Sequence, residues 1–500
     1  TVLGPRLSGK QSNIKDFFLG GKTLPWWSVS GSMIATEISA LTFIGVPGMV
    51  FAMEGDWTYL QWGFGSVIAR FAVAYWLIPL YYEKEIYSPY DFMGNRLGEG
   101  ARRLVTGLFA LGSILGQSVR VLVTAIILQV VTGMDAPLCI VIIGAVAILW
   151  TFMGGMQTVI WTDVIQFCLF IFGGVLALSL LIGELGWSQI VELNQVTIDG
   201  SNKDKLTWLD FTTPFQEPRL RYTMWVALIA MPFQNFTAFG IDQLNTQRMF
   251  CCGSVKDARK AMCWSSISII VTILMLAVGA GLFAWYRVYE PSGLIATSFE
   301  KSNNVFPTWI TMEVAPGLSG LILAGAFAAA ISSLDSILAA LSQASLSVFY
   351  GRDKLEAAGN GREMVRLSRI VVCVWGVILT AAGLGLWVVY KKNPDSDLIG
   401  LAFGMVAYTY GPLLGVLAAA ILPIKVSTKG LILGTILSVL LVSWFRPELP
   451  LALEAMGLAA WAQNIILLRP ELTSEWFFPF NASITLLCGW LGALLGSSEE

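Results

Sequence analysis

Long apolar stretches recur along the whole chain and are separated by short polar ones. A helix needs about 20 apolar residues to cross a bilayer, and the sequence contains about twelve such stretches. Strands of a membrane β-barrel would alternate between apolar and polar residues, whereas the run from Val121 to Val131 is nearly continuously apolar. The pattern therefore predicts an all-α polytopic membrane protein. The expected spans are 27–53, 58–82, 104–130, 135–154, 158–186, 221–245, 261–287, 317–349, 370–390, 397–423, 428–445 and 476–496.

Two of these spans are interrupted by polar residues and helix breakers. The first contains Ala35–Thr42 followed by Pro47, and the sixth contains Met231–Thr237, which includes Pro232. Irregular backbone at membrane depth is tolerated only where it lines a cavity or is buried in protein, so matched breaks favour a site near the membrane midplane. The alternative is that glycine and proline are simply frequent in membrane helices.

The interruptions divide the chain into two similar halves. We expect a cytoplasmic segment 1–26, a first five-helix repeat 27–186, an extracellular connection 187–220, a second five-helix repeat 221–423 and additional transmembrane helices in 424–500. An odd number of helices in each half gives the halves opposite topology. This is the organisation of secondary transporters that are built from inverted repeats.

Composition removes several classes of function. Hydrophobic residues make up 56% of the 500 residues and charged residues only 13%, and the net charge of −2 argues against a nucleic-acid partner. The chain has no histidine, which excludes imidazole metal sites and histidine-dependent catalysis. The seven cysteines show no CxxC spacing, so we expect neither a disulfide framework nor a metal cofactor.

The basic residues indicate an orientation. If the N-terminus is cytoplasmic, 19 of the 31 lysines and arginines, Arg248 among them, fall in cytoplasmic segments. This bias follows the positive-inside rule, so we expect a multi-pass protein of the plasma (inner) membrane with a cytoplasmic N-terminus. The polar stretch after Thr1 does not resemble a signal peptide, and the presence of a further helix before it stays open.

Ionisable side chains inside the spans are costly and therefore informative. Helical spacing places Ala329, Ser332, Ser333 and Ser336 on one face, with Asp335 at its edge. Hydroxyl groups, free carbonyls and a carboxylate form an oxygen cage that suits a hard cation such as sodium. The alternative is that the serines only permit close packing of helices.

Two further ionisable residues each have two interpretations. Asp163 is either an anchor at the membrane interface beside Trp161 or part of a second cation site or release path. Arg120 either pairs with Glu37 or a nearby carbonyl, which is the default, or binds a carboxylate of the substrate.

Several segments, in order along nearly the whole chain, resemble motifs of the solute:sodium symporter family. They are Asp16–Lys22, Ser39–Gly45, Gly154–Asp163, Asp242–Arg248 and Ser332–Ser336. The resemblance implies a leucine-transporter-type fold with a five-plus-five inverted repeat and two extra C-terminal helices. It also implies the use of a sodium gradient to import sugars, sialic acids, vitamins, carboxylates or amino acids, with sodium as the coupling ion and no other cofactor.

The resemblance implies two sodium sites. The main one would use backbone carbonyls of Ala35, Ile38 and Ala329 with the hydroxyls of Ser332 and Ser333. The additional one would use Asp163, Ser332, Asp335 and Ser336. Asp335 stands where family members with that site often carry a hydroxyl residue. Its extra negative charge would strengthen cation binding or make the site sensitive to protons.

For the substrate, the bacterial sialic acid and sugar symporters of the family offer the closest local pattern. Glu37 departs from it, because the sialic acid type has a hydroxyl there, and a carboxylate beside an anionic substrate needs a compensating charge. The residues expected at the substrate are Glu37, Ser39, Thr42, Gln61, Arg120 and Asn235.

We therefore expect a sodium-coupled symporter, not an enzyme, that imports a small polar solute, sialic acid or sugar-like, by alternating access. The expected partners are the solute, sodium and the lipid bilayer, with the protein functional as a monomer. Alternatives are a carrier of the same fold for a monocarboxylate, amino acid or other zwitterion, and a proton-coupled carrier that uses Glu37 and Asp335. A serine hydrolase lacks a base, and a channel would need a symmetric filter.

Overall fold

The computed structural model describes most of the chain. Residues Asp16–Leu19 of the first motif, Gly154 and Gly155 of the third, and most of the N-terminal segment lie outside the described residues. The described residues are 20–84, 86, 88–153, 156–198, 200–289, 299–350, 361–392, 398–446, 450, 453–454, 457–469 and 472–496. Within these ranges the regular secondary structure is helical apart from one antiparallel hairpin and an isolated bridge between Leu24 and Cys252.

The elements up to and including the hairpin come first. They are η1 (Gly20–Lys22), α3 (Trp26–Glu37), α4 (Ala40–Phe51), η2 (Thr58–Gln61), α5 (Trp62–Ala72), the π-helical turn η3 (Val73–Leu77), α6 (Ile78–Glu83), α7 (Pro89–Leu97), α8 (Glu99–Thr132), α9 (Ala136–Met153), α10 (Met156–Leu185), α11 (Trp187–Leu193), β1 (Gln195–Ile198) and β2 (Ser201–Asp204).

The second half and the C-terminal helices follow. They are the π-helical turn η4 (Val226–Ala230), α12 (Met231–Gly240), α13 (Gln243–Met249), α14 (Val255–Trp264), η5 (Ser265–Ile267), α15 (Ser268–Tyr289), α16 (Phe299–Met312), α17 (Leu318–Tyr350), α19 (Gly361–Lys392), α20 (Leu398–Ile421), α21 (Thr428–Phe445), α23 (Ala459–Leu468), η6 (Ser474–Trp476) and α24 (Phe477–Gly496).

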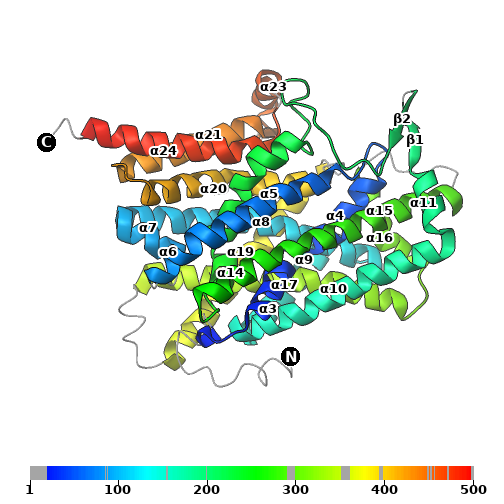
Figure 1. The fold of residues 1–500 in the computed structure, drawn as a ribbon, viewed down its shortest axis with the longest axis horizontal. Helices are drawn as coiled ribbons and strands as arrows, with labels where there is room; N and C mark the ends of the chain where they lie inside the picture. The colour runs from blue at the N-terminus through cyan, green and yellow to red at the C-terminus, as the bar shows by residue number, and fades with distance from the viewer. Residues whose placement is uncertain are drawn as a thin grey trace.

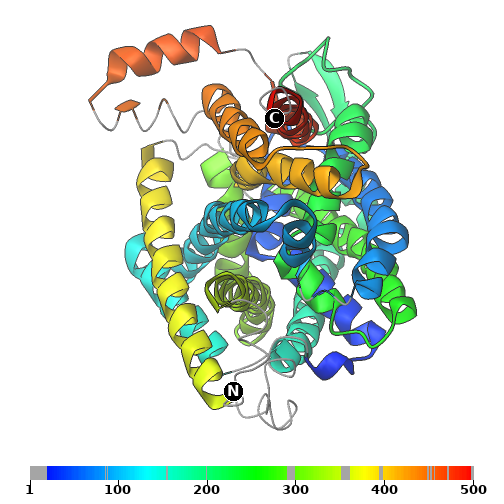
Figure 2. The ribbon, with the colours of Figure 1, turned by 90° about the vertical axis from the view of Figure 1, so that its left-hand side faces the viewer.

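The structure confirms the pattern of membrane-spanning helices. In the described part of the chain, nine helices are long and apolar enough to cross a bilayer, and the bent pair α3 and α4 makes a tenth. The remaining two expected spans correspond to the shorter apolar helices α9 and η4–α12. Most helices run across Figure 1 in a common direction, with α11 and the hairpin at one end and α7 at the other, and many appear end-on in Figure 2.

The break in the first span lies where the sequence predicts it. Helix α3 ends at Glu37, Ile38 is extended, and α4 starts after Ser39 at an angle of 55° to α3. The Ser39 hydroxyl accepts a hydrogen bond from the Leu41 N–H at 3.2 Å, and the Thr42 hydroxyl accepts one from the Ser39 N–H at 3.5 Å. This capping box satisfies the N–H groups of Leu41 and Ser39 at the start of α4 and so stabilises the interruption.

The break in the sixth span lies later than predicted. Helix α12 continues from Met231 through Gly240, so the expected interruption at Met231–Thr237 is wrong. Pro232 lies in the first turn of α12, directly after η4, where a missing N–H is tolerated. The chain leaves the helix at Ile241, and the Asp242 carboxylate caps α13 by accepting from the Leu244 N–H at 2.8 Å.

Candidate functional site

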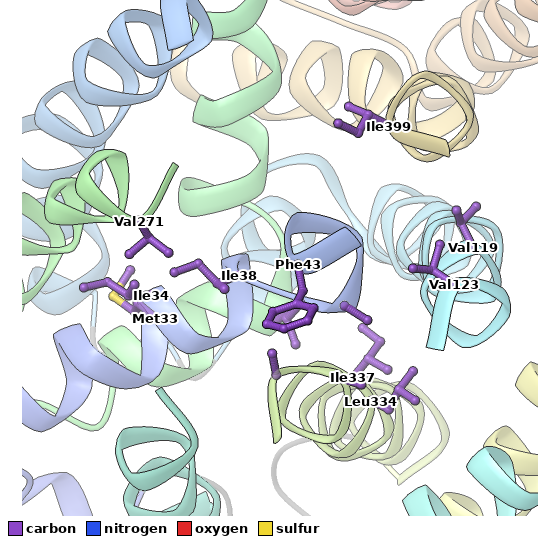
Figure 3. Close-up of a cluster of buried hydrophobic side chains, with 14 of the residues drawn as sticks. Met33, Ile34, Ile38, Phe43, Val119, Val123, Val271, Leu334, Ile337 and Ile399 are labelled. Carbon is purple, nitrogen blue, oxygen red and sulfur yellow. The ribbon is translucent and has the colours of Figure 1, made fainter. Parts of the chain in front are cut away.

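The broken end of α3 faces two serines of α17. The Ser332 hydroxyl donates to the Ala35 carbonyl at 2.9 Å, and the Ser333 hydroxyl donates to the Ala329 carbonyl at 3.2 Å. Both serines are fully buried. Figure 3 shows Ile38 at the end of α3 and Phe43 after the break, with Phe43 near Leu334 and Ile337 of α17. The structure thus brings together the groups expected in the main sodium site, with Ile38 at the end of α3.

The electrostatics of this place favour a cation. The last carbonyls of a helix have no partner within the helix and carry the negative end of its dipole. Ala35 and Thr36 lie in the last turn of α3 and present such carbonyls toward Ser332 and Ser333. The buried hydroxyls add further oxygen ligands, so a dehydrated monovalent cation can exchange water for protein oxygens here.

Beside this cluster, Asp163 of α10 forms a buried ion pair with Arg248 of α13. The two residues are 0% and 1% exposed, and Arg248 Nη2 lies 3.1 Å from Asp163 Oδ2. Ser32 joins them, because its hydroxyl donates to Asp163 at 2.5 Å and accepts from Arg248 Nε at 2.8 Å. Arg248 also donates to the Ser336 hydroxyl and to the Leu244 carbonyl. The guanidinium therefore reaches two residues of the expected additional sodium site.

Asp335 brings a second carboxylate to the same place. It is fully buried, and its Oδ1 accepts from the Ser336 hydroxyl at 3.1 Å. Its Oδ2 and the Oδ1 of Asp163 have no hydrogen-bond partner among the described residues. Two carboxylates face one guanidinium here, and an uncompensated buried carboxylate is costly. The arrangement can take up one further cation.

Arg248 and Ser32 were not expected at this site from the sequence. Arg248 was counted as a cytoplasmic loop charge, but it is buried because the break at Ile241 starts α13 beneath α3. The available signal was its place at the end of the Asp242–Arg248 motif. A polar residue in the middle of α3, such as Ser32, carried no signal of its own.

An open cavity with an empty volume of about 1220 Å³, including the space at its mouth, lies beside the break. Helices α3, α4, α8, α12 and α20 contribute to its walls. Five of the six residues expected at the substrate line it; these are Glu37, Ser39, Thr42, Arg120 and Asn235. The lining also includes polar residues that were not expected from the sequence, among them Gln117, Gln234, Asp242, Asn245 and Tyr410.

Two charged residues of the cavity wall, Glu37 and Arg120, have different partners. Glu37 forms an ion pair with Arg70, which is fully buried and also donates to Ser265 at 3.1 Å. Arg120 Nη1 donates to the Thr36 carbonyl at 3.0 Å, which confirms pairing with a nearby carbonyl. Because Arg70 balances Glu37, the charge of Arg120 is not consumed by Glu37 and faces the cavity.

Asp242 is the other carboxylate on this wall. Its Oδ2 accepts from the Tyr410 hydroxyl at 2.6 Å, and its Oδ1 caps α13. The amide oxygens of Gln234 and Asn245 are buried and have no partner among the described residues. The cavity therefore offers acceptors as well as the donors of Arg120, which suits a solute with several polar groups.

The structure places Gln61 outside the cavity lining. Its Nε2 donates to the carbonyls of Thr58 and Tyr222 at 3.2 and 3.0 Å, and its Oε1 accepts from the Asp210 N–H at 3.1 Å. All three polar contacts of this fully buried amide are thus directed to the backbone. In this geometry the amide fixes the connection that precedes η4 and does not face the cavity.

Comparisons with known proteins agree with this geometry. A model of the sodium:solute symporter family matches residues 17–438. The sodium/sialic acid symporter SiaT of Proteus mirabilis is 26% identical, with 88% of this chain and 86% of that protein covered. The sodium/glucose cotransporter of Vibrio parahaemolyticus is also 26% identical, with 86% and 79% covered.

Solved structures share the fold. A Na⁺-coupled sialic acid symporter in a substrate-bound outward-open state superposes with a TM-score of 0.77 at 24% identity, covering 99% of this chain and 94% of that one. MHP1, a nucleobase-cation-symport-1 family transporter, superposes with a TM-score of 0.52 at 15% identity, with 98% and 96% covered. The chain therefore belongs to the sodium:solute symporter family, and its function is sodium-coupled symport of a small solute.

Proposed function

We propose that the solute is a small polar organic molecule with a carboxylate, of the sialic acid or acidic sugar type, and that it binds between the break and Arg120. The observation that carries this proposal is the ion pair between Glu37 and Arg70. It neutralises the carboxylate nearest the break and leaves the Arg120 guanidinium on the cavity wall. An arginine fork binds a carboxylate through two parallel charge-assisted hydrogen bonds. The relatives named for sialic acid support the same class.

A second candidate solute is an amino acid or another zwitterion. Asp242 lines the cavity, and among the described residues its Oδ2 is bonded to the Tyr410 hydroxyl alone. A solute ammonium group would pair with Asp242 while its carboxylate pairs with Arg120. Competition by amino acids, and not by sialic acids, would select this candidate.

The proposed cycle uses sodium to prepare the solute site. Sodium bound by Ala35, Ile38, Ala329, Ser332 and Ser333 would hold the two halves of the broken helix together. Ser39 and Thr42, on the other side of the break, would then be ordered for the solute. Because this is binding linkage, the solute must raise sodium affinity by the same factor. Opening of the cavity to alternate sides would complete transport.

We propose the cellular arrangement on the same basis. The protein would lie in the plasma (inner) membrane with a cytoplasmic N-terminus, so that the hairpin β1–β2 is extracellular. The halves 27–186 and 221–423 would form the inverted repeat. A single copy contains every residue of both candidate sites, which supports function as a monomer.

Changing Arg120 to Gln should raise the Kd for N-acetylneuraminic acid by roughly 10- to 100-fold, because one charge-assisted pair is lost. Arg120→Lys should recover only part of this loss, because lysine lacks the planar fork. Isothermal titration in sodium chloride measures both variants. A retained shift of melting temperature on sodium addition is the control for an intact fold. Wild-type affinity in Arg120→Gln would refute the carboxylate contact.

Changing Asp335 to Asn should weaken the second cation site. The amide removes the uncompensated charge, so we expect sodium binding with a lower Hill coefficient and a half-saturating concentration raised by roughly 10-fold. The variant changes Asp335 alone, so the ion pair between Asp163 and Arg248 is kept. Sodium-dependent uptake at fixed solute measures both quantities. An unchanged Hill coefficient would mean that Asp335 holds no coupling ion.

A further inference from the structure

A lysine at the outer end of the molecule is fully buried, although lysine side chains normally reach solvent. Lys205 follows β2 directly and is 0% exposed. Its ammonium donates to the carbonyls of Ala52, Gly55 and Met53 at 2.5, 2.9 and 3.2 Å. It also lies 4.4 Å from the centroid of the Phe283 ring. Neither the sodium cluster nor the solute cavity uses this residue.

The chemistry of this contact is that of a helix cap. Ala52 is the C-cap of α4, so the carbonyls around it lie at the negative end of the helix dipole. An ammonium group has three N–H donors and no acceptor, which matches the three carbonyls. The face of Phe283 adds a cation–π contact on α15. Lys205 is thus a tethered cation that occupies the outer end of α4.

The hairpin that carries Lys205 is held in place by α15. The Asn194 amide, just before β1, donates to the Ala280 carbonyl at 3.0 Å, and Arg287 donates to the Leu193 carbonyl at 2.5 Å. Figure 1 shows β1 and β2 near the end of α15. Lys205 therefore links α4 to an element that is anchored independently.

The inner end of α4 lies at the candidate site. It begins at Ser39, directly after the break, and carries Thr42 on the cavity wall. Helix α4 is continuous over twelve residues in spite of Pro47, and most of these residues are buried, so its packed surroundings transmit a displacement of its outer end to the break. We propose that Lys205 is a positioning residue for sodium binding, because its ammonium caps α4 and thereby fixes the break next to Ser332. This inference rests on the sodium site of the proposed function.

The test is a sodium titration of the purified full-length protein that follows the melting temperature, with potassium chloride keeping ionic strength constant. Burial lowers the pKa of Lys205 to about 7, so the titration is made at about pH 6, where the ammonium form dominates. Lys205→Ala should raise the half-saturating sodium concentration by roughly tenfold. Added propylammonium fits the space of the missing side chain and should restore the wild-type value, whereas propan-1-ol should not.

Lys203→Ala is the matched control. Lys203 lies on the same hairpin and pairs with Asp56 at 3.0 Å, but its side chain is 32% exposed, so we expect wild-type sodium binding. If Lys205→Ala is not recovered folded, Phe283→Leu replaces it. This change removes the ring beneath the ammonium, together with the ring's contacts with Phe51 and Arg287, and keeps an apolar side chain in the same place. It should raise the half-saturating concentration by roughly threefold.

The outcomes distinguish a failure of the role given to Lys205 from a failure of the proposed sodium site. Wild-type sodium binding in Lys205→Ala, or in Phe283→Leu when the first variant is not recovered, would overturn the role of Lys205. A shift that propylammonium does not reverse would also overturn it, because the loss would then come from packing and not from the missing charge. A wild-type protein that gains no stability from sodium would instead contradict the sodium site itself.

Discussion

Replacing Ser332 with alanine should raise the half-saturating sodium concentration by roughly 10- to 100-fold. The hydroxyl contacts the Ala35 carbonyl at 2.9 Å and, with Ser333, joins α17 to the broken end of α3. Its removal would take one oxygen ligand from the proposed cation site. Sodium-dependent uptake and sodium-dependent thermal stabilisation should show the same displacement.

Ser342→Ala provides the matched control for this change. Ser342 lies on the same helix, is equally buried and bonds to Ser368 at a distance from the break. The control should lose some stability but keep the wild-type response to sodium. Full sodium dependence in Ser332→Ala would exclude the proposed cluster as the main sodium site.

The second large effect concerns Arg248. Changing it to Met leaves Asp163 and Asp335 buried without a counter-ion, and removal of one partner from a buried ion pair costs about 3–5 kcal/mol. We expect the free energy of unfolding to fall by this amount, with a clear loss of folded protein after purification. Thermal unfolding in the same detergent measures the difference.

The companion variant Arg248→Met with Asp163→Asn tests the reason for this loss. It removes one charge of each sign, so it should recover a large part of the lost stability, and the coupling energy follows from the double-mutant cycle. Arg259→Met, at a partly exposed arginine of α14 that donates to the Ala74 carbonyl, should change little. Equal stability of Arg248→Met and the wild type would show that the two carboxylates need no guanidinium.

The parts of the fold that were predictable come from strong local signals. Apolar length alone located every expected span in the described part of the chain. The break near Ser39 was recognisable because a capping sequence interrupts an otherwise apolar span. Asp335 stood out because carboxylates are rare at membrane depth, and it drew attention to the hydroxyl of Ser332 on the same helix.

The parts that were not predictable depend on tertiary contacts. Pro232 resembles a helix breaker, but the π-helical turn before it allows α12 to continue to Gly240. Arg248 resembles a loop charge until α13 is seen to return beneath α3. The Gln61 amide bonds to backbone groups that lie about 150 residues away in sequence. Local sequence patterns do not encode contacts over such a separation.

The most direct test is equilibrium binding of radioactive sodium to the purified protein, compared with Ser332→Ala and Ser342→Ala. The wild type and Ser342→Ala should bind sodium that excess sodium displaces and excess potassium does not, and N-acetylneuraminic acid or another accepted solute should tighten this binding. Ser332→Ala should bind little under the same conditions. Equal binding by the wild type and Ser332→Ala, or equal displacement by potassium, would contradict a sodium site at the break between α3 and α4.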